Sequence, residues 1–313
     1  MQQPVVKVGI MNEPAIRFRF SADYRQGDKI FSGEQHAEVC DGKVKWDGGV
    51  YDTVEFTPCD MANSYFELYD VTIGVNFHWE RKENQSFRGS LRLIVENGKL
   101  TAVNILPVEE YLLSVISSEM SATASLELLK AHAVISRSWL LSQIEKNKEL
   151  TASDTKYEPS TVTDTEIVRW YDREDHVNFD VCADDHCQRY QGITRESTQK
   201  VREAIGATFG QVLMYDGKLC DARFSKSCGG VFEQFENCWE PKHYDYLVAR
   251  RDSASPMDFP DLTVEENARK WILEAPEAFC NTTDKQILSQ VLNSYDQETV
   301  DFYRWKVEYT QQE

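Results

Sequence analysis

The sequence predicts an α+β fold, in which a β-rich N-terminal part and two hairpins pack on a helical hairpin. Three observations favour this class. Residues 1–88 contain short runs of β-branched and aromatic residues, and helical periodicity begins at Pro107. Strands are expected before, between and after the helices, without the regular β-α-β alternation of a parallel sheet.

The N-terminal part is expected to consist of short strands that are separated by tight turns. VVKVGIM, AIRFRF and VEFTP are rich in strand-forming residues, and the Asp-Gly and Gly-Gly dipeptides between them are typical of turns. LRLIVENGKLTAVNIL predicts a hairpin with Asn97 and Gly98 as its two-residue turn, because both residues tolerate the positive φ angles that such a turn requires.

Two amphipathic helices are predicted between Pro107 and Leu141. Pro107 suits a first helical position, since the N–H that it lacks would have no partner there. The first helix weakens at its serines, so that Glu119 is expected where this helix ends. Ser125 is the expected N-cap of the second helix. The two apolar stripes comprise Val108, Tyr111, Leu112 and Val115, then Leu126, Leu129, Ala133 and Leu140.

Beyond these helices, the polar residues 147–174 are expected to form a loop. STQKVREAIGATFG predicts a short helix that ends at a glycine, and GQVLMYDGKLCDARFS predicts a second hairpin that turns at Asp216-Gly217. TVEENARKWILEA and DKQILSQVLNSY have helical spacing, and Thr263 and Asp284 are their expected N-caps.

The composition excludes several classes of protein. With 313 residues, of which 41% are hydrophobic, the chain can bury packed cores. Its net charge of −18 argues against nucleic acid as a partner, because nucleic-acid binding needs a basic surface. No run of about 18 apolar residues is present, so no membrane span is expected. The start, MQQPVVKVGIM, lacks the basic and apolar regions of a signal peptide.

Several motifs resemble, in the same order, those of the stage II sporulation protein D / LytB (SpoIID) family. VEEYLLSVISSEM and LELLKAHAVISRSWL carry the strongest similarity, and FRGSLRLIVENGKLTAVNILP and RFSKSCGGVFEQFENCW extend it over most of residues 85–245. The resemblance implies a β-rich N-terminal region at 1–88 and a family core at 89–313. This core would include a zinc-like loop at about 147–192 and the C-terminal helices.

The family offers two activities, and the resemblance does not choose between them. Sporulation-type members are lytic transglycosylases, which cleave the MurNAc–GlcNAc β-1,4 bonds of peptidoglycan to 1,6-anhydro products. LytB-type members enhance a partner amidase, so that a non-catalytic glycan-binding module is the alternative. Either activity implies an extracytoplasmic location, in the periplasm or cell envelope, with the signal sequence absent from this chain.

Glu119 falls on the family's acid position. A lytic transglycosylase needs one carboxyl group, which protonates the glycosidic oxygen and then helps to deprotonate the muramic acid 6-hydroxyl. Such an acid needs a pKa of roughly 6, to which burial and the negative pole of a helix end contribute. Judged without the resemblance, a glutamate near a helix end is usually a solvated surface group.

Further substrate contacts are expected from the resemblance at Ser227 and Gly229 of SKSCGG, and at Lys130 and Tyr111. A tight turn is the equal alternative for SKSCGG. Aromatic residues could stack on sugars or belong to the core; the candidates are Tyr111, Tyr190, Phe224 and Trp239. We interpret two residues of the second helix as structural. His132 is expected to be a core histidine, with a hydrogen bond to substrate as the alternative, and Arg137 is expected to be a buried ion-pair partner. A Cys228 nucleophile with His243 as its base is a weak hypothesis.

A metal site is predicted in HVNFDVCADDHC. Its ligands would be His176, Cys182, His186 and Cys187, a set suited to tetrahedral zinc, and a disulfide between the two cysteines is the alternative. Some clostridial members of the similar family carry such a site, which favours zinc. Four protein ligands close the site, so its role would be structural and a zinc hydrolase is disfavoured. Asp184 and Asp185 could orient the histidines.

Overall fold

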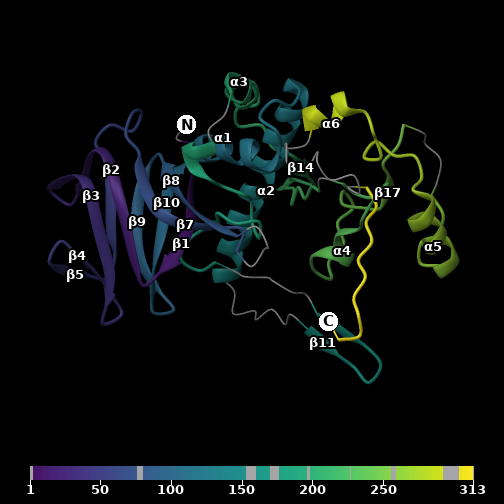
Figure 1. The fold of residues 1–313 in the computed structure, drawn as a ribbon, viewed down its shortest axis with the longest axis horizontal. Helices are drawn as coiled ribbons and strands as arrows, with labels where there is room; N and C mark the ends of the chain where they lie inside the picture. Colours follow the sequence, from purple (N-terminus) through teal and green to yellow (C-terminus); the bar gives the residue numbers. More distant parts are fainter. Residues whose placement is uncertain are drawn as a thin grey trace. The chain divides into compact units, whose positions relative to one another are not determined.

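The computed structural model describes residues 3–75, 80–152, 160–169, 176–195, 198–225, 227–254, 259–291 and 303–312, without the side chains of 149–152 and 195. The chain divides into two compact units. The first comprises residues 1–157 and 172–222, and the second comprises 158–171 and 223–313. Both strands and helices are well represented, which confirms the α+β class (Figure 1).

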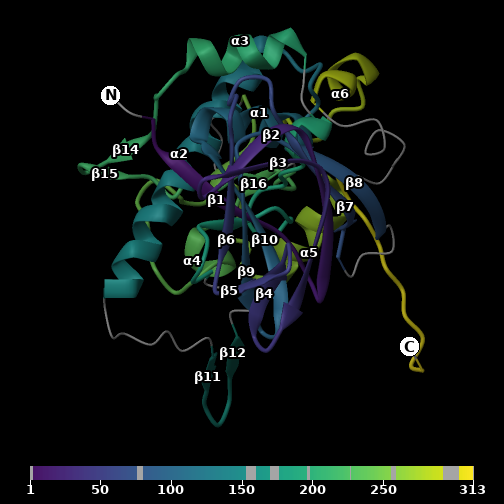
Figure 2. The same cartoon turned by 90° about the vertical axis from the view of Figure 1, so that its left-hand side faces the viewer.

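The first unit is built on an eleven-stranded sheet with the order β13-β1-β10-β9-β6-β2-β3-β4-β5, to which β7 and β8 are joined through β2. Figure 2 looks onto the end of this sheet where β4 and β5 lie. The strands are β1 (Val5–Glu13), β2 (Ala15–Gln26), β3 (Lys29–Cys40), β4 (Lys43–Trp46), β5 (Gly49–Tyr51), β6 (Val54–Pro58), β7 (Phe66–Ile73), β8 (Arg81–Phe87), β9 (Ser90–Glu96), β10 (Lys99–Pro107) and β13 (Val181–Cys182).

The N-terminal strands share one sheet with the region that carries the helices. β1 pairs antiparallel with β10 from Val5↔Pro107 to Glu13↔Leu100, and β6 pairs with β9. Ladder hydrogen bonds therefore join the strands on either side of residue 88, and the division expected there stays a prediction. Residues 153–159 and 170–175 of the predicted zinc-like loop lie outside the described residues.

Both predicted hairpin turns are confirmed. Asn97 and Gly98 join β9 to β10 with φ angles of 49° and 75°. Asp216 and Gly217 join β14 (Met214–Tyr215) to β15 (Lys218–Leu219) with φ angles of 47° and 74°. Two successive positive φ angles match the right-handed twist of the flanking strands, which is why these dipeptides specify the register locally.

The helical pair begins and turns close to where the sequence predicts. Pro107 is the N-cap of α1 (Val108–Glu119), one residue earlier than its predicted place. Ser125 precedes α2 (Leu126–Ala152) and accepts the Leu128 N–H at its Oγ, as expected of an N-cap. α3 (Gln199–Ala207) confirms the third predicted helix. None of the described helices combines the length and hydropathy that crossing a bilayer requires.

The loop predicted from residue 147 is wrong at its start. α2 continues to Ala152, although the polar sequence at its end has no apolar stripe to indicate a helix. Part of the remaining polar stretch forms a small hairpin in the second unit, from β11 (Ser160–Val162) and β12 (Ile167–Arg169).

The second unit is mainly irregular, with short elements. It contains β16 (Val231–Phe232), α4 (Phe235–Cys238), β17 (Arg250–Arg251), α5 (Glu265–Glu274) and α6 (Lys285–Val291). The N-cap of α5 is Val264, next to the predicted Thr263. Asp284 accepts the Gln286 N–H at 2.8 Å, which confirms it as the residue that caps α6. Residues 292–295, the end of the helix predicted there, lie outside the described residues.

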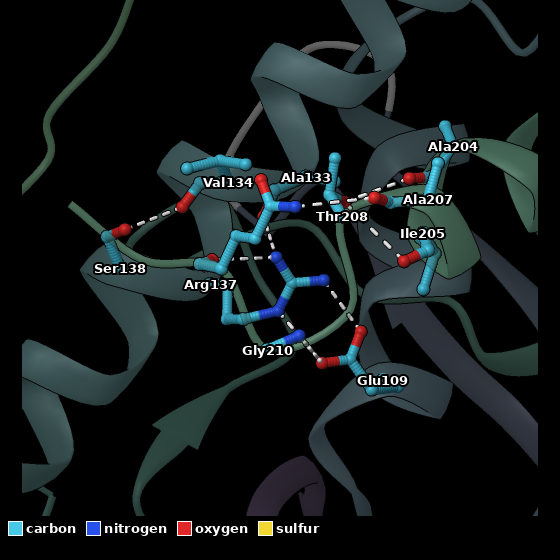
Figure 3. A network of polar contacts seen from close by, with 11 residues as sticks. Glu109, Ala133, Val134, Arg137, Ser138, Ala204, Ile205, Ala207, Thr208 and Gly210 are labelled. Atoms are coloured by element: carbon cyan, nitrogen blue, oxygen red, sulfur yellow. Dashed lines mark hydrogen bonds and ion pairs between the residues drawn. The ribbon is translucent and has the colours of Figure 1, made fainter.

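A buried ion pair joins the helices of the first unit, as predicted for Arg137 (Figure 3). The Arg137 Nη2 and Nε lie 2.6 and 2.9 Å from the two carboxylate oxygens of Glu109 in α1. Arg137 Nη1 also donates to the carbonyl oxygens of Ala133 and Gln211, and Gly210 N–H donates to Glu109. The Arg137 side chain is 1% exposed and that of Glu109 is 13% exposed. This network therefore ties α1 and α2 to the segment after α3.

Replacement of Glu109 by glutamine should strongly destabilise the first unit. The substitution keeps the shape of the side chain but leaves a buried guanidinium without its counterion, which costs about 3–5 kcal/mol. Asp70→Asn is the matched control, because it breaks the exposed Arg17–Asp70 pair and should cost about 0–1 kcal/mol. Urea unfolding followed by fluorescence measures both changes. Equal effects of the two substitutions would contradict the structural role of the Glu109–Arg137 pair.

Candidate active site and Cys/His cluster

Glu119 is the last residue of α1 and is half-buried. The helix ends there because Met120 turns to an extended conformation, with φ of −121° and ψ of 169°. One carboxylate oxygen of Glu119, Oε1, accepts the backbone N–H of Arg189 at 2.7 Å. A donor from a segment 70 residues away therefore fixes the orientation of this carboxyl group.

The segment that supplies this donor is attached to the first unit at several points. Tyr111 donates its hydroxyl to Gln188 at 3.2 Å, and Gln191 N–H donates to Ser114 Oγ at 2.9 Å. Tyr190 donates its hydroxyl to Asn104 in β10 at 2.7 Å. Because these contacts flank Arg189 and are largely buried, the Arg189 N–H is held in place by α1 and β10.

The four predicted metal ligands converge immediately before this segment. The ligand atoms of His176, Cys182, His186 and Cys187 all lie within 4.8 Å of one another. Cys187 Sγ is 3.4 Å from His176 Nε2 and 3.5 Å from His186 Nδ1, and Cys182 Sγ is 3.9 Å from His186 Nδ1. With zinc–ligand bonds of about 2.0–2.3 Å, the edges of a tetrahedral site are about 3.4–3.8 Å long. These donors therefore fit a tetrahedral zinc ion.

The same residues could instead form the alternative disulfide, but both thiols are free in the structure. Cys187 accepts the Cys182 N–H at its Sγ, and hydrogen bonds from Cys187 and from the two histidines hold the pKa of Cys182 far below that of an ordinary thiol. A thiolate is the form that ligates metals. Asp185 pairs with Arg189, with 3.0 Å between its Oδ1 and the guanidinium Nε, so that it contributes to this segment through that ion pair.

The edge of the sheet holds the cluster. β13 pairs parallel with β1, and the Asp180 and Ala183 N–H groups donate to the carbonyl oxygens of Lys7 and Gly9. Phe179 stacks on His176 with 4.6 Å between ring centroids. A Cβ at Gly9 would lie 2.6 Å from the Phe179 ring, so that only glycine permits this close approach.

Two predicted aromatic contacts are buried instead. Tyr111 is 0% exposed and stacks on Tyr190 with 4.9 Å between ring centroids. Neither ring offers a face to a sugar, so we replace the predicted substrate contact at Tyr111 with a packing role. Lys130 is half-buried and pairs with Glu127 at 2.8 Å on the outer side of α2. A contact between Lys130 and substrate remains a prediction.

His132 is a core residue, in line with its structural interpretation. It is 1% exposed, and burial lowers its pKa to about 4. The imidazole is therefore neutral at physiological pH, and a wholly buried ring is unsuited to hydrogen bonding with a glycan.

The SKSCGG motif belongs to the second unit, where Gly229 and Gly230 form a turn directly before β16 and Lys226 lies outside the described residues. The Gly229 carbonyl oxygen accepts hydrogen bonds from three donors, namely Trp271 Nε1, the Tyr303 hydroxyl and Arg304 Nη2. These contacts favour the structural alternative for Gly229, and a substrate contact at Ser227 or Gly229 remains a prediction. Trp239 is 46% exposed, with the Arg223 guanidinium 4.4 Å from its ring centroid.

Cys228 has little nucleophilic character. Burial raises the pKa of its thiol to about 12, and its close neighbour is Cys280. His243, the base considered for it, is exposed and binds Glu236 and Asp245, which raise its pKa.

The sequence did not indicate Arg189, Gln188 or Asn104, which connect the cluster to Glu119 and to β10. Arg189 acts through its backbone N–H, which any residue except proline could supply. No pattern of residue types could therefore have identified it. The position of Gln188, directly after the last cluster ligand, was the only available signal.

Comparison with known proteins gives two family matches. Residues 96–215 match the model for the stage II sporulation protein (SpoIID) family, and residues 233–313 match a domain of unknown function, DUF8618.

The similar curated proteins are longer than the matched part. Stage II sporulation protein D of Bacillus subtilis is 27% identical over 139 residues, which are 44% of this chain and 36% of that protein. An uncharacterised protein of Brachyspira hyodysenteriae is 28% identical over 48% of the chain and 34% of its own length. The amidase enhancer of Bacillus subtilis is 29% identical over 185 residues, which are 57% of this chain and 21% of that protein. The matches thus span about a third or less of these relatives.

His132 should make stability depend on pH. Its pKa is about 4 when folded and about 6.5 when unfolded, so between these values the unfolded chain binds more protons and stability falls as the pH falls. From about pH 7 to about pH 5 this lowers the free energy of unfolding by about 2 kcal/mol. Urea unfolding at both pH values should show a smaller loss for His132→Gln. His36→Gln, at an exposed position, is the control, and unchanged pH dependence in His132→Gln would contradict the interpretation.

Gly9→Ala should weaken metal binding at the Cys/His cluster. The added methyl group displaces Phe179 and with it the stacked His176, and disturbed support of a ligand typically costs about 10–100-fold in affinity. Zinc competition with a chromophoric chelator measures the change. Gly206→Ala in α3 is the control, because a Cβ there meets no atom within 4 Å. Equal affinities of the two variants would show that Phe179 does not support His176.

Proposed function

Because this chain belongs, through residues 96–215, to the stage II sporulation protein (SpoIID) family, we propose that it is a lytic transglycosylase of peptidoglycan. Its substrate is the MurNAc–GlcNAc glycan strand, and its place of action is extracytoplasmic. The amidase enhancer among its relatives also points to a cell-wall function. Glu119 is the catalytic acid in this proposal.

The hydrogen bond between Glu119 and the Arg189 backbone carries the proposal. A lyase of this type needs one carboxyl group in a fixed orientation, first to protonate the leaving oxygen and then to take the proton of the attacking hydroxyl. The Arg189 N–H fixes one oxygen of Glu119 at 2.7 Å.

Zinc would have a structural role in this site. His176, Cys182, His186 and Cys187 would hold it, and four protein ligands leave no open position for a reacting water. Zinc would supply binding energy that fixes the loop. The residues after Cys187 would then hold the Arg189 N–H within hydrogen-bond distance of Glu119. This closed donor set also argues against the zinc hydrolase considered as a third function.

A glycan-binding module that enhances an amidase is the second candidate. The similarity to the amidase enhancer of Bacillus subtilis extends over 57% of the chain and favours it. In that case Glu119 would bind a glycan without cleaving it, and a cell-wall amidase would be the partner.

Digestion of purified peptidoglycan tests the proposal. Wild type should release products that end in 1,6-anhydromuramic acid, identified by mass spectrometry, from intact or peptide-stripped strands. Glu119→Gln should lower the rate by about 10²–10⁴-fold, because the amide cannot donate the proton. Glu145→Gln is the matched control, since Glu145 is an exposed acid of α2 and its loss should leave the rate unchanged.

Other products would overturn the proposal in distinct ways. Reducing-end products would mean that water attacks and that a second carboxylate takes part. Binding of both strand types without release of any product would favour the amidase-enhancing module.

A further inference from the structure

The second unit contains a separate group of metal-type ligands, which we name the Cys2Asp cluster: Cys228, Asp252 and Cys280. One ligand atom from each residue lies within 4.8 Å of the others, and the two Sγ atoms are 3.7 Å apart. All three residues are partly buried. The cysteines are 52 residues apart in sequence, so that only the fold brings them together.

Backbone hydrogen bonds hold Cys228 and Asp252 close to each other. Cys228 precedes β16 and Asp252 follows β17, and these strands pair through Val231↔Arg251 and Phe232↔Arg250. Asp252 N–H donates to the Gly230 carbonyl oxygen at 3.0 Å, which closes the end of this ladder.

The third ligand is attached to the second. Phe279 N–H donates to the Asp252 carbonyl oxygen at 2.9 Å, and Cys280 N–H donates to Asp252 Oδ2 at 3.2 Å. The side chain of Asp252 is therefore oriented by the same residue that supplies the second thiol. Ligands that the backbone holds in place lower the cost of organising a site.

The basic side chains near the cluster do not neutralise the Asp252 carboxylate. No lysine or arginine among the described residues forms an ion pair with Asp252. Arg304 donates to the carbonyl oxygens of Gly229, Trp271 and Ile272, and Arg251 donates to that of Glu277. These guanidinium groups thus satisfy backbone carbonyls in the same unit.

We propose that Cys228, Asp252 and Cys280 form a second metal site, which binds a thiophilic divalent cation such as Zn²⁺ in the second unit. Two thiolates on one zinc ion, each at about 2.3 Å, lie about 3.8 Å apart in a tetrahedron, close to the spacing seen here. Binding releases the two thiol protons to solvent. Among the described residues the cluster supplies three ligands, so a solvent molecule would complete the tetrahedral site. The site is independent of the proposed peptidoglycan chemistry.

A disulfide between the two cysteines fits the arrangement less well. Its sulfurs must approach from 3.7 Å to about 2.0 Å. It also gives no role to the Asp252 carboxylate, which the backbone aims at the thiols.

Zinc content of the reduced full-length chain tests the proposal. After equilibration with Zn²⁺ and removal of excess metal, mass spectrometry of the metal should show about one equivalent fewer in Cys280→Ser than in wild type. Asp252→Asn, which preserves shape, should weaken zinc binding at this site by at least about 10-fold. Cys187→Ser reports on the Cys/His cluster separately, so that failure of one site does not obscure the other.

Cys238→Ser is the matched control, because Cys238 is an exposed thiol of the same unit outside the cluster, and it should retain the wild-type zinc content. Circular dichroism confirms that each variant is folded. Cobalt substitution should give thiolate-to-metal absorption in Cys187→Ser that is lost when Cys280→Ser is added. Equal zinc content in wild type and Cys280→Ser would overturn the proposal. Two thiols that resist alkylation in metal-free protein until a reductant is added would show a disulfide in its place.

Discussion

The buried pair between Arg137 and Glu109 is the constraint on which the helical part of the first unit depends. A guanidinium that is 1% exposed must satisfy its donors within the protein, and it does so with a carboxylate of α1 and with carbonyl oxygens of α2 and of the segment after α3. Loss of any of these contacts would leave the buried Arg137 guanidinium without one of its partners. The relative position of the two helices, and so the place where α1 ends at Glu119, follows from this requirement.

A second dependence leads from the Cys/His cluster to the candidate acid. The cluster ends at Cys187, and two residues later Arg189 directs its N–H at Glu119. Between them Gln188 binds Tyr111 on the face of α1. The loop therefore fixes the orientation of the carboxyl group at the end of the helix, and disorder in the loop would release Glu119 without any change to the acid itself. Through this coupling, a metal bound at the cluster would affect the orientation of Glu119 without taking part in the proposed reaction.

The sequence predicted what depends on neighbouring residues. Asn97-Gly98 specifies its turn by itself, Ser125 caps the helix that follows it, and the four Cys/His ligands lie within a dozen residues. It did not predict contacts between distant segments, such as Arg189 with Glu119 or Cys228 with Cys280. The substrate role expected of Tyr111 could not be distinguished from packing, because a stacking aromatic and a core aromatic have the same place on an amphipathic helix. The length of α2 was missed because the polar sequence at its end has no apolar stripe to mark it.

The parallel pairing of β1 with β13 has a consequence for synthesis of the chain. Val8 pairs with Val181, which is 181 − 8 = 173 residues later, although the pair is only two residues long. At a translation rate of about 5–20 residues per second, β13 is synthesised about 9–35 s after β1. During that time one edge of β1 presents unpaired backbone groups beside β10. The nascent chain is therefore open to intermolecular strand pairing until the Cys/His loop arrives to cover this edge.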